Sequence, residues 1–283
     1  MKKLLLTTML VTALAGCSSA KTSAASASGD HLARIQSAGK ITIATEGVWS
    51  PFTYHDETTD ELVGFDVEVA KAVADKLGVE AEFKEVNFDG GLTGVAQGTF
   101  DMMANGVDIT EERSNSYDFT EPYAYDHAVI VTKADNSDIK SFADLKGKTT
   151  ANSTGSTYAE MGENNGATVT NVDTLGETMD LVLNGTVEAT INANTSIQDY
   201  FNTTGNSDKL KVAATDEETT KYAFPLKKGS DNDSLREAIN KAIDELRSEG
   251  KLSEISAKYF VQISQQNNCM KGSMFRTLFV CKK

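Results

Sequence analysis

The residues best able to carry chemistry, histidine and cysteine, are few in this chain and far apart. The three histidines, His31, His55 and His127, lack the spacing of a metal site, so we expect them to be ordinary surface residues. No cysteine lies between residues 18 and 268, which excludes a thiol nucleophile from that stretch. The sequence therefore predicts neither a metal ion nor a disulfide in the central part of the chain.

The sequence also lacks the residue sets of common catalytic and nucleotide-binding sites. No Ser-His-Asp set is evident, and the glycine-rich run Gly90–Gly94 has no lysine to hold a phosphate, so it is better interpreted as a helix start. Cys269 and Cys281 could pair with each other in an oxidising compartment. We expect a binding protein without a cofactor rather than an enzyme.

The first 17 residues have the layout of a bacterial secretory signal. Two lysines precede an apolar stretch, Leu4–Ala15, and small residues precede a cysteine. Leu14-Ala15-Gly16-Cys17 resembles the lipobox of bacterial lipoproteins, in which the cysteine is acylated, while a plain signal peptide with an incidental cysteine is the alternative. The stretch is shorter than the ~20 apolar residues of a permanent membrane span. The sequence thus predicts a signal peptide over residues 1–16 and an extracytoplasmic tether over 17–34, lipid-anchored to the membrane at Cys17.

The composition is that of an acidic globular protein. The 283 residues carry a formal net charge of −14, and 40% of them are hydrophobic, which is enough for an ordinary core. A negative surface repels phosphate backbones, so we expect no nucleic-acid partner. The length left after the tether suits one large domain or two lobes, and we expect a monomer.

Stretches typical of strands alternate with stretches typical of helices along most of the chain. Ile41–Thr45 predicts a buried strand, and the apolar residues of 64–78 fall on one face of a helix that Gly78 would end. This alternation argues for parallel α/β sheets. A second α/β series begins after the strand Ala128–Thr132, so the fold class is α/β with two similar lobes.

The chain is expected to cross between the lobes near Val129–Lys133 and to return near Lys221–Leu226. Two crossings make a hinge, and a hinge places a cleft between the lobes. The last strong helix, about Leu235–Glu249, should begin with a capping box made by Ser234 and Glu237. We predict that residues 35–130 form the first part of the first lobe, that residues 131–223 form the second lobe, and that residues 224–260 return to the first lobe.

A set of short motifs is spread over about residues 35–260. The main one is Gly64-Phe65-Asp66-Val67-Glu68-Val69, and the others are Ser50–Tyr54, Leu62-Val63, Ile109–Arg113, Tyr117–Tyr123, Asp144–Lys148 and Lys258–Phe260. Together they resemble the polar amino-acid family of periplasmic-type solute-binding proteins, the receptors of ATP-driven importers. The resemblance implies a two-lobed fold of type II with two hinge crossings, and the motifs look most like those of cystine-binding members.

The resemblance also implies a site for a ligand carboxylate. In the family, the arginine of a Thr-x-x-Arg segment binds the ligand's α-carboxylate, and this segment maps onto Thr110 and Arg113. A planar guanidinium matches a carboxylate in a bidentate pair, although the residues alone would favour a surface arginine beside two glutamates. Ser156 and Thr157 match a family turn at a helix start that can bind the same carboxylate, or else form a simple N-cap.

Further ligand contacts follow from the same resemblance. Trp49 and Phe88 match positions whose side chains sandwich the ligand in relatives, with core packing as the alternative. Glu46 lies in the same strand-end loop as Trp49 and could contact the ligand's side chain. Asn105 and Gly106 match the segment whose backbone carbonyl accepts a hydrogen bond from the ligand's ammonium.

One departure from the family concerns the ligand's ammonium. Relatives often carry an aspartate after the strand Val187–Ile191, where this chain has Ala193 beside Asn192, which we include among the candidate contacts. Burying an ammonium without a counter-charge is costly. Asp108 stands where relatives commonly have a small hydroxyl residue, and we hypothesise that it supplies the missing charge. Alternatively, the ligand is not a standard α-amino acid.

The sequence thus favours a lipid-anchored receptor that captures a polar amino acid, with cystine as the candidate, and delivers it to the permease of an ABC importer. An alternative is a dehydratase of the same fold that acts on a small carboxylic acid, with Glu46 or Asp108 as general acid. A ligand-sensing domain is a third possibility. Residues 261–283, beyond the last motif, have no assigned role.

Overall fold

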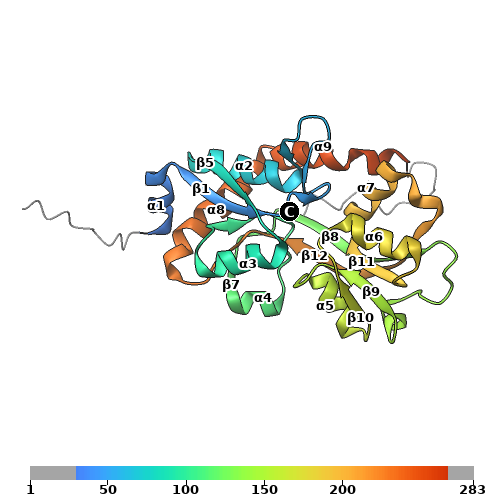
Figure 1. Ribbon diagram of the computed structural model, residues 1–283. Coiled ribbons are helices and arrows are strands. Elements are labelled where there is room, and N and C mark those ends of the chain that lie inside the picture. Colours follow the sequence, from blue (N-terminus) through green and yellow to red (C-terminus); the bar gives the residue numbers. More distant parts are fainter. Residues whose placement is uncertain (1–29, 267–283) are drawn as a thin grey trace, which may run out of the picture.

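The protein consists of two α/β lobes joined at the centre of the molecule, as the computed structural model in Figure 1 shows. The structure describes residues 30–266, with the side chains of residues 30–260. The predicted signal peptide, the lipidation site Cys17 and the pair Cys269 and Cys281 all lie outside the described residues. Predictions for these residues therefore remain predictions from the sequence.

The first lobe is built on a parallel three-stranded sheet in the order β5-β1-β6. Two small antiparallel sheets, β2-β3-β4 and β13-β7, lie beside it. Its elements are α1 (His31–Ala38), β1 (Lys40–Thr45), β2 (Val48–Trp49), β3 (Thr53–His55), β4 (Leu62–Val63), α2 (Phe65–Leu77), β5 (Glu80–Glu85), α3 (Phe88–Gln97), β6 (Met102–Met103), α4 (Glu111–Ser116), β7 (Tyr117–Phe119), β13 (Pro225–Lys227), the 3-10 turn η3 (Ser230–Asn232), α8 (Asp233–Ser248) and α9 (Lys251–Gln266).

Two amphipathic helices close the core of this lobe. In α2, Val69, Val73 and Leu77 repeat at helical spacing and pack into one cluster with Ile239 and Ile243 of α8. Gly78 ends α2 in the left-handed conformation, as predicted. The register of these two helices is thus fixed by their buried faces.

The predicted capping box at the start of α8 is wrong. The helix begins at Asp233, after the turn η3, and its N-cap Asn232 makes no side-chain cap bond. The hydroxyl of Ser234 instead donates to Asp30. Because the preceding 3-10 turn runs into the helix, Ser234 lies inside the first turn, where it cannot act as the N-cap.

The start of the folded part also differs from expectation. Residues 31–34, assigned to the tether, belong to α1. His31 was expected to be a surface histidine, yet its Nε2 lies 2.7 Å from Asp101 Oδ1 and its Nδ1 contacts Asn232. These partners raise the pKa of His31, chiefly through the hydrogen bond with Asp101. The histidine therefore ties α1 to the rest of the lobe.

The second lobe is built on a five-stranded sheet in the order β10-β9-β11-β8-β12. Strands β9, β10 and β11 are parallel to one another, whereas β8 runs antiparallel to β11 and β12. Its elements are β8 (Ala124–Lys133), η1 (Phe142–Leu145), β9 (Thr149–Asn152), α5 (Thr157–Asn164), β10 (Thr168–Asn171), α6 (Leu175–Asn184), β11 (Ala189–Ala193), α7 (Asn194–Thr204), η2 (Asn206–Asp208) and β12 (Leu210–Tyr222).

Strand β8 is buried on both faces of this sheet. Val129 and Val131 pack with Met179 and Val182 of α6 on one face, and Ile130 packs in a separate cluster on the other. Successive side chains of a strand point to opposite faces, so a continuous apolar run is needed where both faces are covered. For this reason the apolar run Ala128–Thr132 predicts a strand from the sequence alone.

The two lobes are joined by a pair of antiparallel segments. Residues 124–127 at the start of β8 pair with residues 219–222 at the end of β12 (Figure 1). The first crossing was expected near Val129–Lys133, but those residues lie within the five-stranded sheet, where Val129 pairs with Asn192. The first connection between the lobes therefore lies at residues 124–127, before the predicted position. The prediction was displaced because the most apolar part of β8 lies inside the second lobe, and the strand begins several residues before it.

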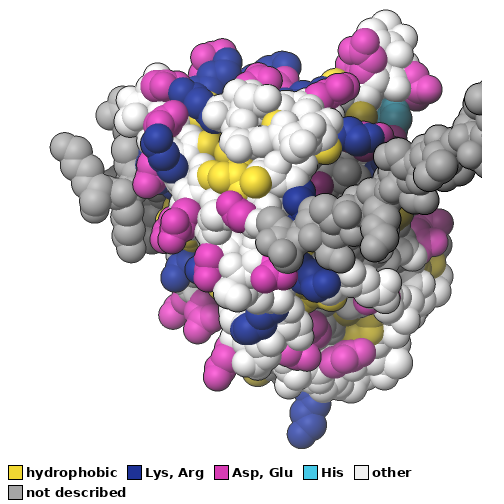
Figure 2. Space-filling view, turned by 90° about the vertical axis from the view of Figure 1, so that its left-hand side faces the viewer, with side chains coloured by type: hydrophobic (Ala, Val, Ile, Leu, Met, Phe, Trp, Pro, Cys, Tyr) yellow, Lys and Arg dark blue, Asp and Glu magenta, His cyan; other side chains and the backbone are white. Residues whose placement is uncertain are grey.

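Charged side chains are scattered rather than gathered on the end of the first lobe. Figure 2 shows acidic and basic side chains interspersed over this face. None of the helices within residues 30–266 combines the length and the apolar character needed to cross a membrane.

Candidate functional site

A cleft between the lobes collects most of the predicted ligand contacts. It encloses about 590 Å³ of empty space, part of it open to solvent, and is lined from both lobes. Predicted residues that line it are Glu46, Trp49, Phe88, Asn105, Gly106, Asp108, Ser156, Thr157 and Asn192. Lining residues that we did not predict are Val48, Asn152, Ser153, Tyr158, Asp173, Leu175 and Thr178.

The cleft lies at the carboxyl ends of the parallel strands of both lobes. Glu46 follows β1 and Asn105 lies just after β6, whereas Ser153 follows β9 and Asp173 lies just after β10. Loops at this edge of an open α/β sheet are where ligands bind. The same rule applied to the second lobe could have identified Ser153 and Asp173 from the sequence.

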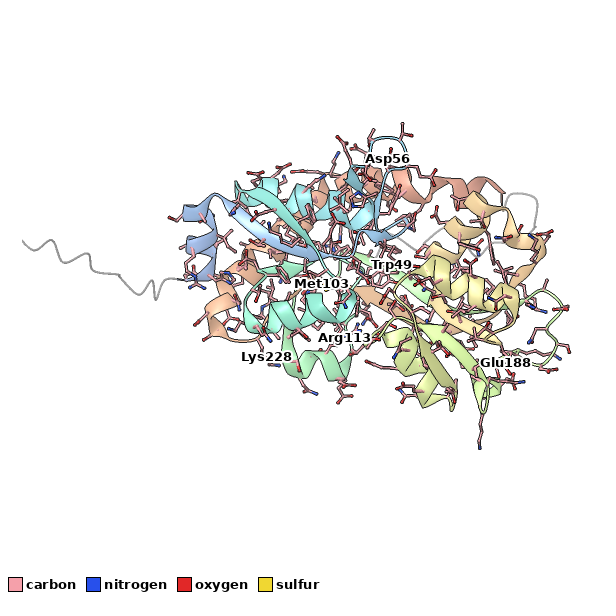
Figure 3. The ribbon with its side chains drawn as sticks, in the orientation of Figure 1. Trp49, Asp56, Met103, Arg113, Glu188 and Lys228 are labelled. Atoms are coloured by element: carbon pink, nitrogen blue, oxygen red, sulfur yellow. The ribbon has the colours of Figure 1, made fainter. Side chains whose placement is uncertain are left out.

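Arg113 lies near the junction of the lobes in Figure 3 and is not among the residues that line the cleft. Its side chain is only 7% exposed, and its guanidinium contacts Asp108 Oδ1 through Nη1. Nη2 donates to the backbone oxygen of Gly155 across the cleft at 3.0 Å. The ring of Phe88 lies 5.3 Å from the guanidinium carbon, within the range of a cation–π contact. Arg113 is thus buried, fixed and shared between the lobes.

Asp108 contacts the other lobe as well. Its Oδ1 accepts a hydrogen bond from the Thr157 hydroxyl at 2.8 Å, in addition to the contact with Arg113. Thr157 opens α5, so the carboxylate also lies close to the N-terminus of a helix. The side chain of Asp108 is 15% exposed and lines the cleft. The proposed counter-charge for a ligand's ammonium is therefore already paired with a cation of the protein.

Glu46 is held by Asn105. The Asn105 amide donates to Glu46 Oε2 at 2.6 Å, while Asn105 Oδ1 accepts from the Glu46 backbone N–H at 2.8 Å. Burial raises the pKa of Glu46 to about 7, although the hydrogen bond from Asn105 opposes this effect. Glu46 therefore changes its charge in the neutral pH range.

A buried carboxyl group supports the neighbouring Gly106. The Gly106 backbone N–H and the Tyr123 hydroxyl both donate to Asp66 Oδ2, the latter at 2.9 Å. Within the described residues Asp66 Oδ1 has no hydrogen-bond partner, and burial raises the pKa of Asp66 to about 7. Asp66, part of the sequence motif that opens α2, thus positions the segment that lines the cleft.

The two predicted aromatic residues both line the cleft but have other partners too. Trp49 stacks on Phe52, with ring centroids 4.4 Å apart and planes 14° apart, above the lobe junction in Figure 3. Phe88 lies against Arg113 and is mostly buried. Each ring therefore presents part of its surface to the cleft and packs with the remainder.

The hydroxyl residues act mainly as helix caps. Thr110 accepts from the Arg113 backbone N–H at 3.0 Å and caps α4, and it does not line the cleft. Ser156 accepts from the Ala159 backbone N–H at 3.1 Å and caps α5 while lining the cleft. The side chain of Asn192 accepts a hydrogen bond from the backbone N–H of the fully buried Ala193.

Within residues 30–266 no group of three or more His, Cys, Asp or Glu residues is placed to hold a metal ion.

Comparison with known proteins relates this chain to bacterial solute-binding proteins. The profile of the bacterial extracellular solute-binding proteins, family 3, matches residues 41–262. The L-cystine-binding protein TcyA of Bacillus subtilis is 40% identical over 266 residues, which cover 92% of this chain and 98% of TcyA.

Solved structures show the same fold. An ancestral arginine-binding protein bound to arginine is 35% identical with a TM-score of 0.72, covering 78% of this chain and 98% of that protein. An ancestral amino acid-binding protein described as a precursor of cyclohexadienyl dehydratase is 26% identical with a TM-score of 0.72, covering 81% and 99%. These similarities confirm the predicted two-lobed α/β fold of type II.

Proposed function

Because this chain belongs to family 3 of the bacterial extracellular solute-binding proteins, we propose that it is the receptor of an ABC importer and captures a small polar amino acid between its lobes. Cystine is the first candidate, since TcyA, at 40% identity, is an L-cystine-binding protein. The observation that carries the proposal is a cleft lined by polar and aromatic side chains of both lobes. Lipid anchoring at Cys17, delivery to a permease and the monomeric state remain predictions from the sequence.

The proposed mechanism is closure around the ligand. Thr157 donates to Asp108 and Arg113 donates to the Gly155 carbonyl, so both lobes already share hydrogen bonds at one side of the cleft. The Ser50 hydroxyl also donates to Asp199 of α7 at 2.7 Å. A ligand that touches both lobes adds to these contacts only when the lobes are together, and it therefore shifts the population toward the closed form. We place the hinge in the paired segments 124–127 and 219–222.

The ligand's ammonium is proposed to lie near Glu46 and Asp108, with the backbone carbonyls of Asn105 and Gly106 as further acceptors. Trp49 and Phe88 offer apolar ring surface for the body of the ligand. A ligand carboxylate would compete with Asp108 for Arg113, because Asp108 lines the cleft and is already paired with the guanidinium, whereas Arg113 does not line the cleft.

A thermal-shift screen of the twenty amino acids and cystine tests the proposed function. A ligand that binds the folded protein alone should stabilise it by about 2.7 kcal/mol when its concentration is 100 times the dissociation constant. We expect cystine, or another polar amino acid, to raise the melting temperature, and calorimetry to give a ratio of one ligand per chain. If none of the compounds raises the melting temperature at millimolar concentration, the proposed function is wrong.

The free energy of unfolding should fall less with rising pH in Glu46→Gln than in the unsubstituted protein. Burial raises the pKa of Glu46 from 4.5 to about 7, so between these pH values the folded protein holds a proton that the unfolded chain has released. The free energy of unfolding then falls as the pH rises through this range, by an amount on the order of 2 to 3 kcal/mol from this group. Urea unfolding at pH 5 and pH 8 measures the difference.

The matched control is Glu80→Gln, because Glu80 is exposed at the start of β5. This variant should keep the pH dependence of the unsubstituted protein, to which the buried carboxyl groups of Asp66 and Asp126 also contribute through their raised pKa values of about 7 and about 6. If the free energy of unfolding depends equally on pH in the unsubstituted protein, in Glu46→Gln and in Glu80→Gln, ionisation of Glu46 does not lower the stability of the folded protein.

A dehydratase is the second candidate. It is supported by the similarity to the precursor of cyclohexadienyl dehydratase and by Glu46, whose pKa of about 7 suits a general acid at neutral pH. A turnover assay with small carboxylic acids, run beside the binding assay, separates the two functions. A receptor releases its ligand unchanged, whereas a dehydratase releases a product.

A further inference from the structure

The guanidinium of Arg113 is held by groups of the protein on the edge formed by Nη1 and Nη2. Nη1 is paired with Asp108, Nη2 donates to the Gly155 carbonyl at 3.0 Å, and the ring of Phe88 lies 5.3 Å from the guanidinium carbon. With only 7% of its side chain exposed, Arg113 does not line the cleft. A bidentate pair with a ligand carboxylate needs two donors on one edge, and on the edge formed by Nη1 and Nη2 each nitrogen already donates to an oxygen of the protein.

Asp108 occupies the donors that suit a ligand carboxylate. Its Oδ1 is shared by a cation from the first lobe, Arg113, and a hydroxyl from the second lobe, Thr157 at 2.8 Å. Thr157 is the first residue of the eight-residue helix α5, whose N-terminus favours negative charge. Both donors reach Oδ1, so Oδ2 is left to accept from a bound amine.

The charged residues that line the cleft also favour an amine over a carboxylate. Glu46, Asp108 and Asp173 contribute carboxyl groups, and the described lining contains no lysine or arginine. Arg113 already compensates the charge of Asp108, so the remaining carboxyl groups, Glu46 and Asp173, favour an ammonium over a carboxylate, beside aromatic rings that can hold an apolar chain.

We propose that Asp108 is a built-in substitute for the ligand's carboxylate, so that the cleft recognises a small primary amine and does not require the α-carboxylate of an amino acid. This inference rests on the proposed function only in taking a small amine-bearing molecule as the ligand of the cleft. It makes Asp108 the residue that decides between an amino acid and the corresponding amine.

The test compares ligands that differ only in their carboxylates. Cystamine has the disulfide chain and both amino groups of cystine without its carboxylates, and cadaverine is related to lysine in the same way. Calorimetry with the full chain should show that each amine binds at least as tightly as its amino acid. In Asp108→Thr, which frees Arg113 and Thr157, the ratio of the two dissociation constants should shift by about tenfold or more toward the amino acid, which corresponds to about 1.4 kcal/mol.

Asp75→Asn is the control for a change of one negative charge, because Asp75 is exposed on α2 and lies outside the cleft lining. It should keep the ratio of the unsubstituted protein. Asp108→Asn, which keeps the shape of the side chain, replaces Asp108→Thr if the latter does not give a cooperative melting curve.

Two results would overturn the inference. The first is that the protein binds cystine or lysine and binds the corresponding amine more than about tenfold more weakly. The second is that the ratio of the dissociation constants of amine and amino acid does not change in either Asp108 variant. The two results above leave the proposed function standing, whereas a third result would overturn both. If the unsubstituted protein binds neither of these amines nor any amino acid, the cleft is not a receptor site for amines and the proposed function itself fails.

Discussion

Arg113→Met should lower the free energy of unfolding by about 3 kcal/mol at pH 7. Removing one partner of a buried ion pair leaves the other charge without compensation, which costs about 3 to 5 kcal/mol in typical proteins. Here the partner is Asp108, 15% exposed, and the hydrogen bond to Gly155 across the cleft is lost as well. Urea unfolding without ligand measures the effect.

Two comparisons isolate the cause. Arg236 pairs with Asp233 three residues away on α8, and both side chains are far more exposed than those of the site, so Arg236→Met should cost less than about 1 kcal/mol. The double variant Arg113→Met, Asp108→Asn should recover much of the lost stability, because no unpaired carboxylate remains. If Arg113→Met and Arg236→Met have equal effects, the pair at the cleft does not stabilise the fold.

Gly106→Ala should disturb both the fold and the cleft. The backbone of Gly106 has φ 55°, and a Cβ atom there would lie 2.4 Å from Trp49 Cζ3, so the indole must move. Positive φ and overpacking each cost about 1 to 3 kcal/mol. Because Trp49 stacks on Phe52 and lines the cleft, we expect a loss of about 3 kcal/mol in stability and about tenfold or more in affinity.

Gly147→Ala is the matched control for the backbone effect. Gly147 has φ 76°, but a Cβ atom there would meet nothing within 4 Å. It should lose about 1 to 2 kcal/mol of stability through backbone strain alone, with ligand affinity unchanged. Unfolding curves and calorimetry on both variants provide the comparison, and equal losses of affinity would show that contact with Trp49 is irrelevant to binding.

Much of the scaffold could be predicted because burial repeats with the period of each element. The apolar faces of α2 and α8 and the continuous run in β8 are visible in the sequence. Strand β12 continues beyond its apolar start to Tyr222, because its polar residues 219–221 pair with residues 125–127 of β8 after an irregularity between Thr215 and Thr219. Hydrogen bonding at a sheet edge leaves no pattern of hydrophobic residues.

In the site, positions could be predicted more readily than partners. Glu46, Trp49, Asn105 and Asp108 do line the cleft. The pairing of Asp108 with Arg113 depends on the turn that precedes α4, and the bond from Thr157 depends on how close the lobes come. Such contacts are set by tertiary structure, so spacing along the chain does not reveal them.

The path of the chain has a consequence for the order in which the protein is completed. The first lobe joins α2 to α8 in one core, although the whole five-stranded sheet of the second lobe lies between these helices in sequence. As the ribosome extends the chain, the second lobe receives all its strands before the first lobe receives α8. The half that emerges first is therefore finished last, and until then its apolar surface is exposed to chaperones and proteases.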